Sequence, residues 1–385
     1  MYIRKCSLSL AKMETCFLWG PRQTGKTTLL KMNYPEIRRY DMLLSDVFER
    51  VSRNPVGFRE ECLNLYHENS SRSQMVIIDE IQKVPLLLDE IHWLMENTSL
   101  RFLLCGSSAR KLKRAHGNLL GGRAIRYELF PLVSAEIPEF DLIRACNHGL
   151  LPRHYDSKYP QKLLQAYIGN YLKEEIALET NIRNLPAFNR FLPAAALTNG
   201  EMVNYTNIAS DCGVSSLTVK EYFQILEDTM MGYMLPAFQK KAKRRQIRTS
   251  KFYFFDIGVN GYLGKYGNIL PGSPLFGKMF EHLIINEIRA HSAYSEKLYP
   301  IAYWKTASGL EVDLILGECE IALEIKSTDN VNQKHLRNLR IFNEEFKVKR
   351  SIVVSLDSQK RITADRIEII PWQLFLKQLW SNLIM

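Results

Sequence analysis

Short apolar runs alternate with amphipathic segments in the first third of the chain. The apolar runs lie at 16–19 and 75–78, and a strand pattern that is apolar after Arg101 lies at 101–105. A segment with apolar residues at helical spacing lies at 86–96. Continuous short apolar runs are typical of buried parallel strands, and their alternation with helices is typical of an α/β domain. We therefore predict an α/β domain with a parallel sheet for residues 1–134.

This alternation is lost in the middle of the chain, between residues 135 and 255. Two candidate helices at 204–209 and 216–228 flank a glycine turn, and two short apolar runs at 233–235 and 251–255 follow. Two helices around a tight turn are typical of a helix-turn-helix, and the two following runs can form the strands of a wing. We predict a helical, winged-helix-like domain here.

The last third of the chain, residues 256–385, alternates again. A helical pattern at 280–290 precedes strand patterns at 311–316 and 321–325, and another helical pattern follows at 331–344. Strands that alternate with helices again indicate an α/β arrangement. We predict a second α/β domain.

Composition narrows the class of protein. The 385 residues suffice for two or three domains, and the net charge of +10 favours polyanionic partners. The seven cysteines are scattered without a Cys-x-x-Cys pair, which predicts a reducing cytoplasmic location and no zinc site. Because no apolar run approaches the length of a membrane span, we predict no membrane partner.

A phosphate-binding pattern follows the first apolar run. It consists of Gly20, Pro21, Arg22, Gln23, Thr24, Gly25, Lys26, Thr27 and Thr28. Glycines in this position let backbone N–H groups form a nest around phosphate oxygens at the start of a helix. Lys26 should reach the β- and γ-phosphates, and the Thr27 hydroxyl should ligate Mg²⁺. A chance glycine turn is the less favoured alternative, so we predict ATP and Mg²⁺ as cofactors.

The second apolar run ends in two carboxylates, Asp79 and Glu80. This is the Walker B pattern, in which a buried strand delivers acidic residues to the nucleotide. Asp79 would hold Mg²⁺ mostly through water, and Glu80 would polarise the attacking water. Strands often end in acidic residues, but the preceding P-loop favours the catalytic interpretation.

Polar and basic residues after the next strands are further candidates. Ser107 follows the strand pattern at 101–105 and could orient the attacking water, although it could equally cap a helix. Arg123 or Arg126 could serve as an arginine finger, either in the same chain or from a neighbouring copy in a homo-oligomer. A surface arginine is the alternative for both.

A basic stretch at 240–248 lies between the two candidate wing strands. It contains Lys240, Lys241, Lys243, Arg244, Arg245 and Arg248 and no acidic residue. Such a stretch beside a helix-turn-helix could follow a phosphate backbone, so DNA is a candidate partner. A packing module with a solvated basic loop is equally compatible with the pattern.

Four residues of the last third could form a metal-dependent site. Asp313 and the Glu324-x-Lys326 pair lie on neighbouring strand patterns, and Glu281 lies on the preceding helix pattern. Two carboxylates on adjacent strands can share a divalent ion that activates water on a phosphodiester, while a lysine stabilises the developing charge. Each element is common by itself.

The motifs together resemble a prokaryotic AAA-type ATPase family. The similar segments are Gly-Pro-Arg-Gln-Thr-Gly-Lys-Thr-Thr-Leu-Leu, Ile-Ile-Asp-Glu-Ile-Gln, Leu-Cys-Gly-Ser-Ser-Ala-Arg, and Gly-Gly-Arg followed by Leu-Phe-Pro-Leu. The resemblance implies a five-stranded parallel sheet and places Lys26, Thr27, Asp79 and Glu80 at the nucleotide. Only about fourteen residues precede the first strand, so the segment that would cover the adenine is short.

The end of the chain extends this resemblance. Tyr-Trp-Lys-Thr-x-x-Gly-x-Glu-Val-Asp-x-Ile-Leu and Leu-Glu-Ile-Lys-Ser are similar to the family's terminal domain, which is of unknown function and related to PD-(D/E)xK nucleases. This implies a PD-(D/E)xK-like fold for the last domain. We expect an ATPase that acts as a switch for a nuclease-like, nucleic-acid-associated domain, or alternatively an ATP-gated metal-dependent DNA endonuclease.

Overall fold

The computed structural model describes residues 2–68, 74–108, 120–169, 182, 184–240 and 244–385. Its first part is a five-stranded sheet with the order β2-β3-β4-β1-β5 in which all neighbouring strands are parallel. The strands are β1 (Cys16–Trp19), β2 (Arg39–Asp41), β3 (Met75–Asp79), β4 (Arg101–Gly106) and β5 (Ile125–Glu128). The predicted five-stranded parallel sheet is confirmed.

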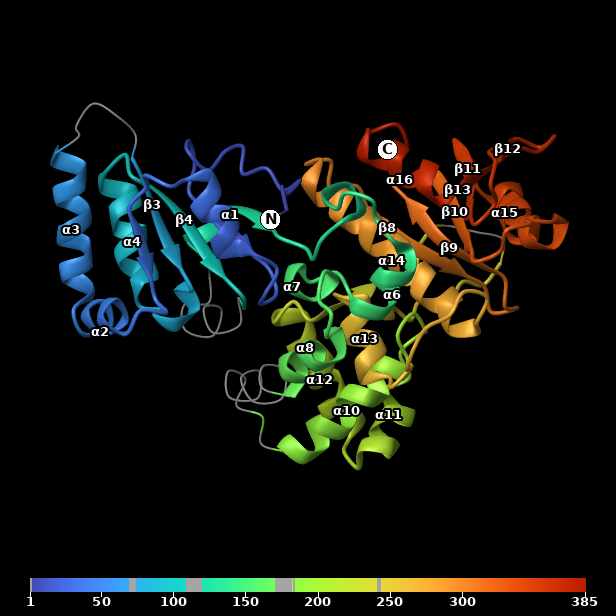
Figure 1. Ribbon diagram of the computed structural model, residues 1–385, viewed down its shortest axis with the longest axis horizontal. Helices are drawn as coiled ribbons and strands as arrows, with labels where there is room; N and C mark the ends of the chain where they lie inside the picture. Colours follow the sequence, from blue (N-terminus) through green and yellow to red (C-terminus); the bar gives the residue numbers. More distant parts are fainter. Residues whose placement is uncertain (1, 69–73, 109–119, 170–181, 183, 241–243) are drawn as a thin grey trace.

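Helices cover this sheet, as Figure 1 shows at its blue and cyan end. They are α1 (Lys26–Asn33), α2 (Ser45–Arg53), α3 (Pro55–Glu68) and α4 (Leu87–Asn97). Successive residues of β1 pack alternately into two hydrophobic clusters, with Phe17 in one and Leu18 in the other. Both faces of the sheet are therefore buried, which explains why its strands are continuously apolar in sequence.

The middle part is helical. Its elements are α6 (Leu142–His148), α7 (Pro152–Tyr155), α8 (Pro160–Ala166), α10 (Leu185–Leu197), α11 (Tyr205–Cys212), α12 (Ser216–Asp228), β6 (Gly232–Leu235), β7 (Lys251–Phe254) and α13 (Ile257–Leu263). Gly213 ends α11 in a left-handed conformation, and the Ser215 hydroxyl caps α12 by accepting a hydrogen bond from the Thr218 N–H. The predicted helix-turn-helix forms, and β6 and β7 pair in antiparallel fashion.

The basic stretch between β6 and β7 runs along the C-terminal sheet. The Phe238 N–H donates to the Tyr303 carbonyl, the Ile247 N–H donates to the Lys305 carbonyl, and the Ala307 N–H donates to the Arg245 carbonyl. Lys241 and Lys243 lie outside the described residues. The described part of this stretch therefore extends the edge of the third domain's sheet rather than projecting as a separate wing.

The C-terminal part contains a mixed six-stranded sheet with the order β12-β13-β11-β10-β9-β8. Its elements are α14 (Pro274–Tyr294), β8 (Ile301–Lys305), β9 (Glu311–Leu316), β10 (Ile321–Lys326), α15 (Gln333–Glu345), β11 (Arg350–Ser355), β12 (Arg361–Ile362), β13 (Ile367–Pro371) and α16 (Trp372–Trp380). Helix α14 begins six residues before the apolar pattern that predicted it, because Ser273 caps it and Pro274 occupies its first position.

The largest hydrophobic cluster joins this sheet to the start of the middle part. Leu132, Ile137 and Leu142 pack in the same cluster as Leu283 of α14 and Leu323 of β10. The predicted limits between the three domains stay a prediction. Within the described ranges, no helix is both long and apolar enough to cross a membrane.

Candidate functional site

The P-loop connects β1 to α1 at the carboxyl edge of the parallel sheet (Figure 1). Gln23 and Gly25 have positive φ angles of 64° and 93°, which turn the chain tightly before the helix. The Lys26 ammonium group donates hydrogen bonds to the carbonyls of Gly20, at 2.7 Å, and Pro21, at 2.9 Å. Burial lowers the pKa of Lys26, and the nearby carboxylates of β3 and its following residue oppose that effect.

Thr27 and Asp79 meet at the start of α1. The Thr27 hydroxyl donates to Asp79 Oδ2 at 2.8 Å, and the Asp79 side chain is fully buried. No group within the described part of the chain forms a hydrogen bond to the other carboxylate oxygen, Asp79 Oδ1. A buried carboxylate oxygen without a donor, beside a hydroxyl, is a donor set that fits the oxygen preference of Mg²⁺.

Glu80 and Ser107 are joined by a residue that the sequence analysis did not select. The Gln82 side-chain amide donates to Glu80 Oε2 at 2.5 Å and to Ser107 Oγ at 3.0 Å. Glu80 has a left-handed backbone with φ of 62°, which redirects its side chain after the strand. In the sequence, Gln82 could have been found only by its position two residues after Glu80. Its contact with Ser107 after β4 depends on the fold.

Gly106 leaves room for this arrangement. A Cβ atom there would lie 2.6 Å from Gln82 Oε1 and 2.6 Å from the Trp19 ring. Side chains cannot approach so closely, so the close packing of β1, β4 and Gln82 requires glycine at this position.

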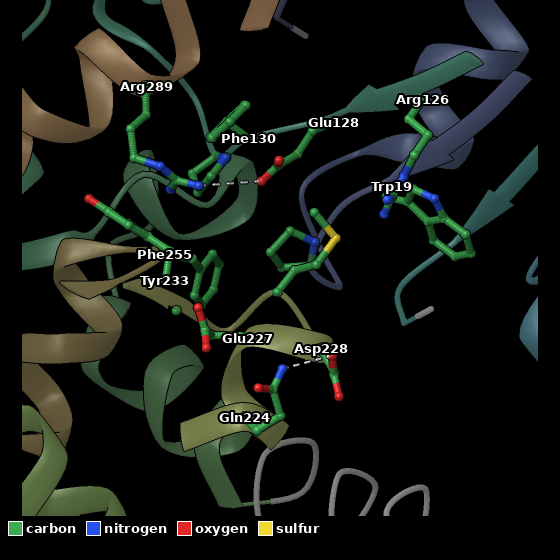
Figure 2. A pocket seen from close by; sticks show the side chains of 14 residues that line it. Trp19, Arg126, Glu128, Phe130, Gln224, Glu227, Asp228, Tyr233, Phe255 and Arg289 are labelled. Atoms are coloured by element: carbon green, nitrogen blue, oxygen red, sulfur yellow. Dashed lines mark hydrogen bonds and ion pairs between the residues drawn. The ribbon is translucent and has the colours of Figure 1, made fainter. Parts of the chain in front are cut away.

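Arg123 lies before the amino end of β5, whereas the P-loop lies at the carboxyl end of the parallel neighbour β1. It precedes β5, and its guanidinium group contacts His92 at 3.0 Å and Glu96 at 3.3 Å on α4. Arg126 lies on β5 itself and lines the cavity between the ATPase and middle parts shown in Figure 2. Arg123 is therefore not brought to the nucleotide pattern within this chain.

The four candidate residues of the C-terminal part form one cluster. The Lys326 ammonium group lies 3.3 Å from Asp313 Oδ2 and forms an ion pair with Glu324. Asp313 also accepts a hydrogen bond of 2.7 Å from the Ile325 N–H. Burial and the charge of Asp313 raise the pKa of Glu281.

Two residues of β7 complete the cluster, and sequence reasoning missed both. The Tyr253 hydroxyl donates to Glu281 Oε1 at 2.7 Å, and the Lys251 ammonium group lies 3.9 Å from the same oxygen. Lys251 also pairs with Glu311 at 2.5 Å. Their sequence distance from the Asp and Glu-x-Lys pattern gave no signal, because the contact depends on how the middle part packs on the C-terminal sheet.

The electrostatics of the cluster separate its carboxyl groups. Burial and the charge of Asp313 hold the pKa of Glu324 well above its usual range. Burial also acts to raise the pKa of Asp313, but the ammonium groups of Lys326 and Lys251 hold it below its usual range. Asp313 is thus the ionised partner of Lys326, and the protonated form of Glu324 is favoured relative to that of a free carboxyl group.

The cluster holds no ready-made metal site of three or more acidic, histidine or cysteine ligands in the part of the chain that the structure describes. Glu324 Oε1 is buried, and no hydrogen-bond donor reaches it from the described residues. The Lys326 ammonium group occupies the position between the two carboxyl groups that a shared cation would take. As arranged here, the donor set does not fit a divalent metal without movement of Lys326.

Three protein-family models match successive parts of the chain. A family model described as an AAA domain matches residues 12–138. Residues 139–268 and 276–375 match two models that are each described as a domain of unknown function (DUF8612 and DUF4143). The N-terminal part of the chain is thus a parallel-sheet α/β domain that resembles P-loop ATPases of the AAA type.

The similarity to two uncharacterised proteins covers nearly the whole chain. An uncharacterised protein of Mycobacterium tuberculosis, Rv2008c, is 25% identical over 380 residues, which cover 94% of this chain and 81% of that protein. An uncharacterised protein of Methanocaldococcus jannaschii, MJ1544, is 22% identical over 412 residues, with 96% and 89% covered.

Two solved structures also match. The Aeropyrum pernix ORC1 protein in complex with DNA has a TM-score of 0.26 and 13% identity, with 66% of this chain and 86% of that chain covered. A signal transduction ATPase of Pyrococcus horikoshii has a TM-score of 0.21 and 14% identity, with 77% and 48% covered. TM-scores this low do not indicate a shared overall fold.

Proposed function

We propose that this protein binds and hydrolyses ATP and that its ATPase domain acts as a switch for the C-terminal domain. The observation that supports hydrolysis best is the buried arrangement at the carboxyl edge of the sheet. There Thr27 contacts Asp79, and Gln82 connects Glu80 to Ser107. A buried polar network of this kind holds reactive side chains in fixed positions before the substrate binds.

Each residue has a distinct role in this proposal. Lys26 would exchange the P-loop carbonyls for the β- and γ-phosphates, and Thr27 and Asp79 would hold Mg²⁺. Bound Mg²⁺ would supply positive charge against the phosphate oxygens. Glu80 orients the attacking water, and Gln82 fixes the rotamer of Glu80 through their 2.5 Å hydrogen bond.

A cavity of about 380 Å³ beside α1 is the site that we propose for the base of the nucleotide. Tyr2 and Ile3 of the N-terminal segment line it together with Thr28 and Met32 of α1 and Arg153 of α7. The short N-terminal segment therefore reaches this side of the P-loop. Its mixed apolar and polar lining suits an adenine ring.

Helix α14 supports the proposed switch, because it contacts both functional regions. Near its C-terminal end, the Arg289 guanidinium group stacks 3.4 Å from the centre of the Tyr233 ring and lies 4.0 Å from Glu128 at the end of β5 (Figure 2). Two turns earlier in the same helix, Glu281 belongs to the C-terminal charge cluster. A shift at the end of β5 would therefore reach that cluster through one rigid element.

Two substitutions test the hydrolysis mechanism. Lys26→Ala removes a phosphate contact and should weaken ATP binding as well as turnover. Glu80→Gln keeps the shape of the side chain but loses the charge that polarises water, so binding should survive while hydrolysis falls by about two to four orders of magnitude. Equal loss of ATP binding in both variants would contradict these roles.

Exposed arginines favour a nucleic-acid partner for the C-terminal domain. Arg245 and Arg248 are exposed at the edge of the sheet beside β8, whereas Arg244 is paired with Glu345. Charge reversal of Arg245 and Arg248 should weaken DNA binding and reduce the slope of log affinity against log salt by roughly 0.7–0.9 for each lost phosphate contact. Reversal of the exposed Lys12 and Lys31 of the ATPase domain provides a matched control.

An ATP-gated metal-dependent DNA endonuclease is the second candidate function. The convergence of Asp313, Glu324 and Lys326 favours it, while the ion pairs of Lys326 count against a metal in the present arrangement. Labelled DNA should be incubated with Mg²⁺ or Mn²⁺, with and without ATP. Cleavage that Asp313→Asn abolishes without affecting ATP hydrolysis would establish the endonuclease, and no cleavage under any condition would favour the switch.

A further inference from the structure

The N-terminal segment places a buried arginine against the P-loop. The Arg4 side chain is only 6% exposed, and its guanidinium group donates four hydrogen bonds. Nη1 donates to the Thr24 carbonyl at 2.5 Å, and Nη2 donates to the carbonyls of Phe130 at 2.7 Å and Pro131 at 3.1 Å. Nε donates to Glu136 Oε2 at 2.9 Å. One side chain thus connects the N-terminal segment, the P-loop and the chain after β5.

We propose that Arg4 is a positioning residue that holds the Thr24–Gly25 peptide in the orientation needed to bind phosphate. This inference rests on the proposed ATP binding and adds a residue that lies outside the P-loop and Walker B motifs. At the sequence level, Arg4 is only one of several basic residues near the N-terminus.

The geometry of the peptide bond gives the reason. The described chain contains no cis peptide bond, and in a planar trans peptide the carbonyl and the next N–H point in opposite directions. Since Arg4 Nη1 binds the Thr24 carbonyl, the Gly25 N–H points away from Arg4, and we assign that side of the loop to the phosphates. Backbone N–H groups on that side would be the phosphate ligands of a P-loop nest.

This peptide needs an external restraint, because its neighbours are conformationally permissive. Gly25 has a φ of 93° and Gln23 a φ of 64°, so two of the three residues from 23 to 25 have positive φ angles. Glycine has more accessible conformations than other residues, and fixing them has an entropic cost. A hydrogen bond from a buried, fully engaged guanidinium group reduces that cost before the nucleotide arrives.

Glu136 determines how Arg4 acts. Its side chain is fully buried and also accepts hydrogen bonds from the N–H groups of Lys5, at 2.6 Å, and Val133, at 3.1 Å. The carboxylate neutralises the arginine locally and fixes the plane of the guanidinium fork. Arg4 therefore contributes hydrogen-bond geometry more than net positive charge, and a lysine cannot replace its fork.

The test is ATP binding and turnover of the full chain in three variants. Arg4→Ala and Arg4→Lys should each raise the Kd for ATP by about 10-fold or more, as expected for loss of a hydrogen bond from a charged group. The kcat at saturating ATP should stay within about twofold, because Glu80, Gln82 and Ser107 are untouched. Lys5→Ala makes the same charge change at the neighbouring exposed position and should bind ATP as the wild type does.

The outcomes separate this inference from the proposed function. A wild-type protein that binds no ATP would contradict ATP binding itself. Arg4 variants that bind ATP with the wild-type Kd would overturn the positioning role and leave ATP binding intact. If Arg4→Ala does not fold, Arg4→Lys and Glu136→Gln decide. A wild-type Kd in both, or a Kd that changes only with equal loss of kcat, would also overturn it.

Discussion

Glu287 provides a quantitative test of how the ATPase domain is attached to α14. This carboxyl group is buried and accepts hydrogen bonds from the Ser134 N–H at 2.6 Å, the Ser134 hydroxyl at 2.9 Å and the Trp380 ring N–H at 2.6 Å. It therefore joins the segment after β5 to α14 and α16. Glu287→Gln removes the titration of this group and keeps its size.

Burial raises the pKa of Glu287 from 4.5 to about 7, although its three donors oppose the shift and the nearby Glu136 adds to it. The folded protein consequently binds more protons than the unfolded chain between these two values. Stability conferred by the protonated group is complete below pH 4.5 and is lost as the pH rises toward 7. At 1.36 kcal/mol per pKa unit, the loss is on the order of 3 kcal/mol.

The assay is urea unfolding of the wild type and Glu287→Gln at several pH values from 5 to 8, followed by tryptophan fluorescence. Other buried groups, including His282 with a pKa lowered to about 4 by burial, titrate in both proteins and cancel in the difference. We expect the variant to gain stability relative to the wild type as the pH rises. The exposed Glu318→Gln is the control. Parallel curves for wild type and Glu287→Gln would show that the three donors outweigh burial and refute the reasoning.

Two further predictions concern the candidate sites. Gln82→Leu removes the hydrogen bonds to Glu80 and Ser107, and it should lower kcat for ATP by about 10- to 100-fold while the Kd for ATP is retained; an unchanged kcat would remove Gln82 from the mechanism. Asp313→Asn leaves the Lys326 charge poorly paired and should cost on the order of 3 kcal/mol of the free energy of unfolding at pH 7 in the same urea measurement. Glu324→Gln should cost less, because burial and Asp313 raise the pKa of Glu324 whereas Lys326 and Lys251 lower that of Asp313. Equal losses in both would contradict these opposite shifts.

The ATPase domain could be predicted from sequence because its chemistry is local. The P-loop residues are consecutive, and Asp79 and Glu80 follow directly from a buried strand. Backbone geometry alone then brings both segments to the same edge of the sheet. Gln82 and Arg4 were missed for the opposite reason. Each acts through a contact with a distant segment, and a glutamine or arginine has no pattern of its own in sequence.

The basic stretch shows a different limit of the sequence. Its charge was evident, but its backbone pairs with β8 through hydrogen bonds that any residue type can form. Nothing in the side-chain pattern distinguishes such an edge segment from a free loop. Only the structure shows that Arg245 lies beside the C-terminal sheet.

In the C-terminal cluster, the sequence pattern located the strands that carry the acidic residues but not the lysine of β7 that contacts them. Asp313 and Glu324 were recognised on neighbouring strands, yet the charges that lower the pKa of Asp313 include Lys251 from β7, which lies before the predicted boundary at residue 255. A buried lysine remains charged only where carboxylates compensate its desolvation. Lys251 meets that condition through Glu281 and Glu311, on α14 and β9. The middle part therefore contributes a necessary charge to the cluster, and a fragment that begins at residue 256 would leave Glu281 and Glu311 without that ammonium group.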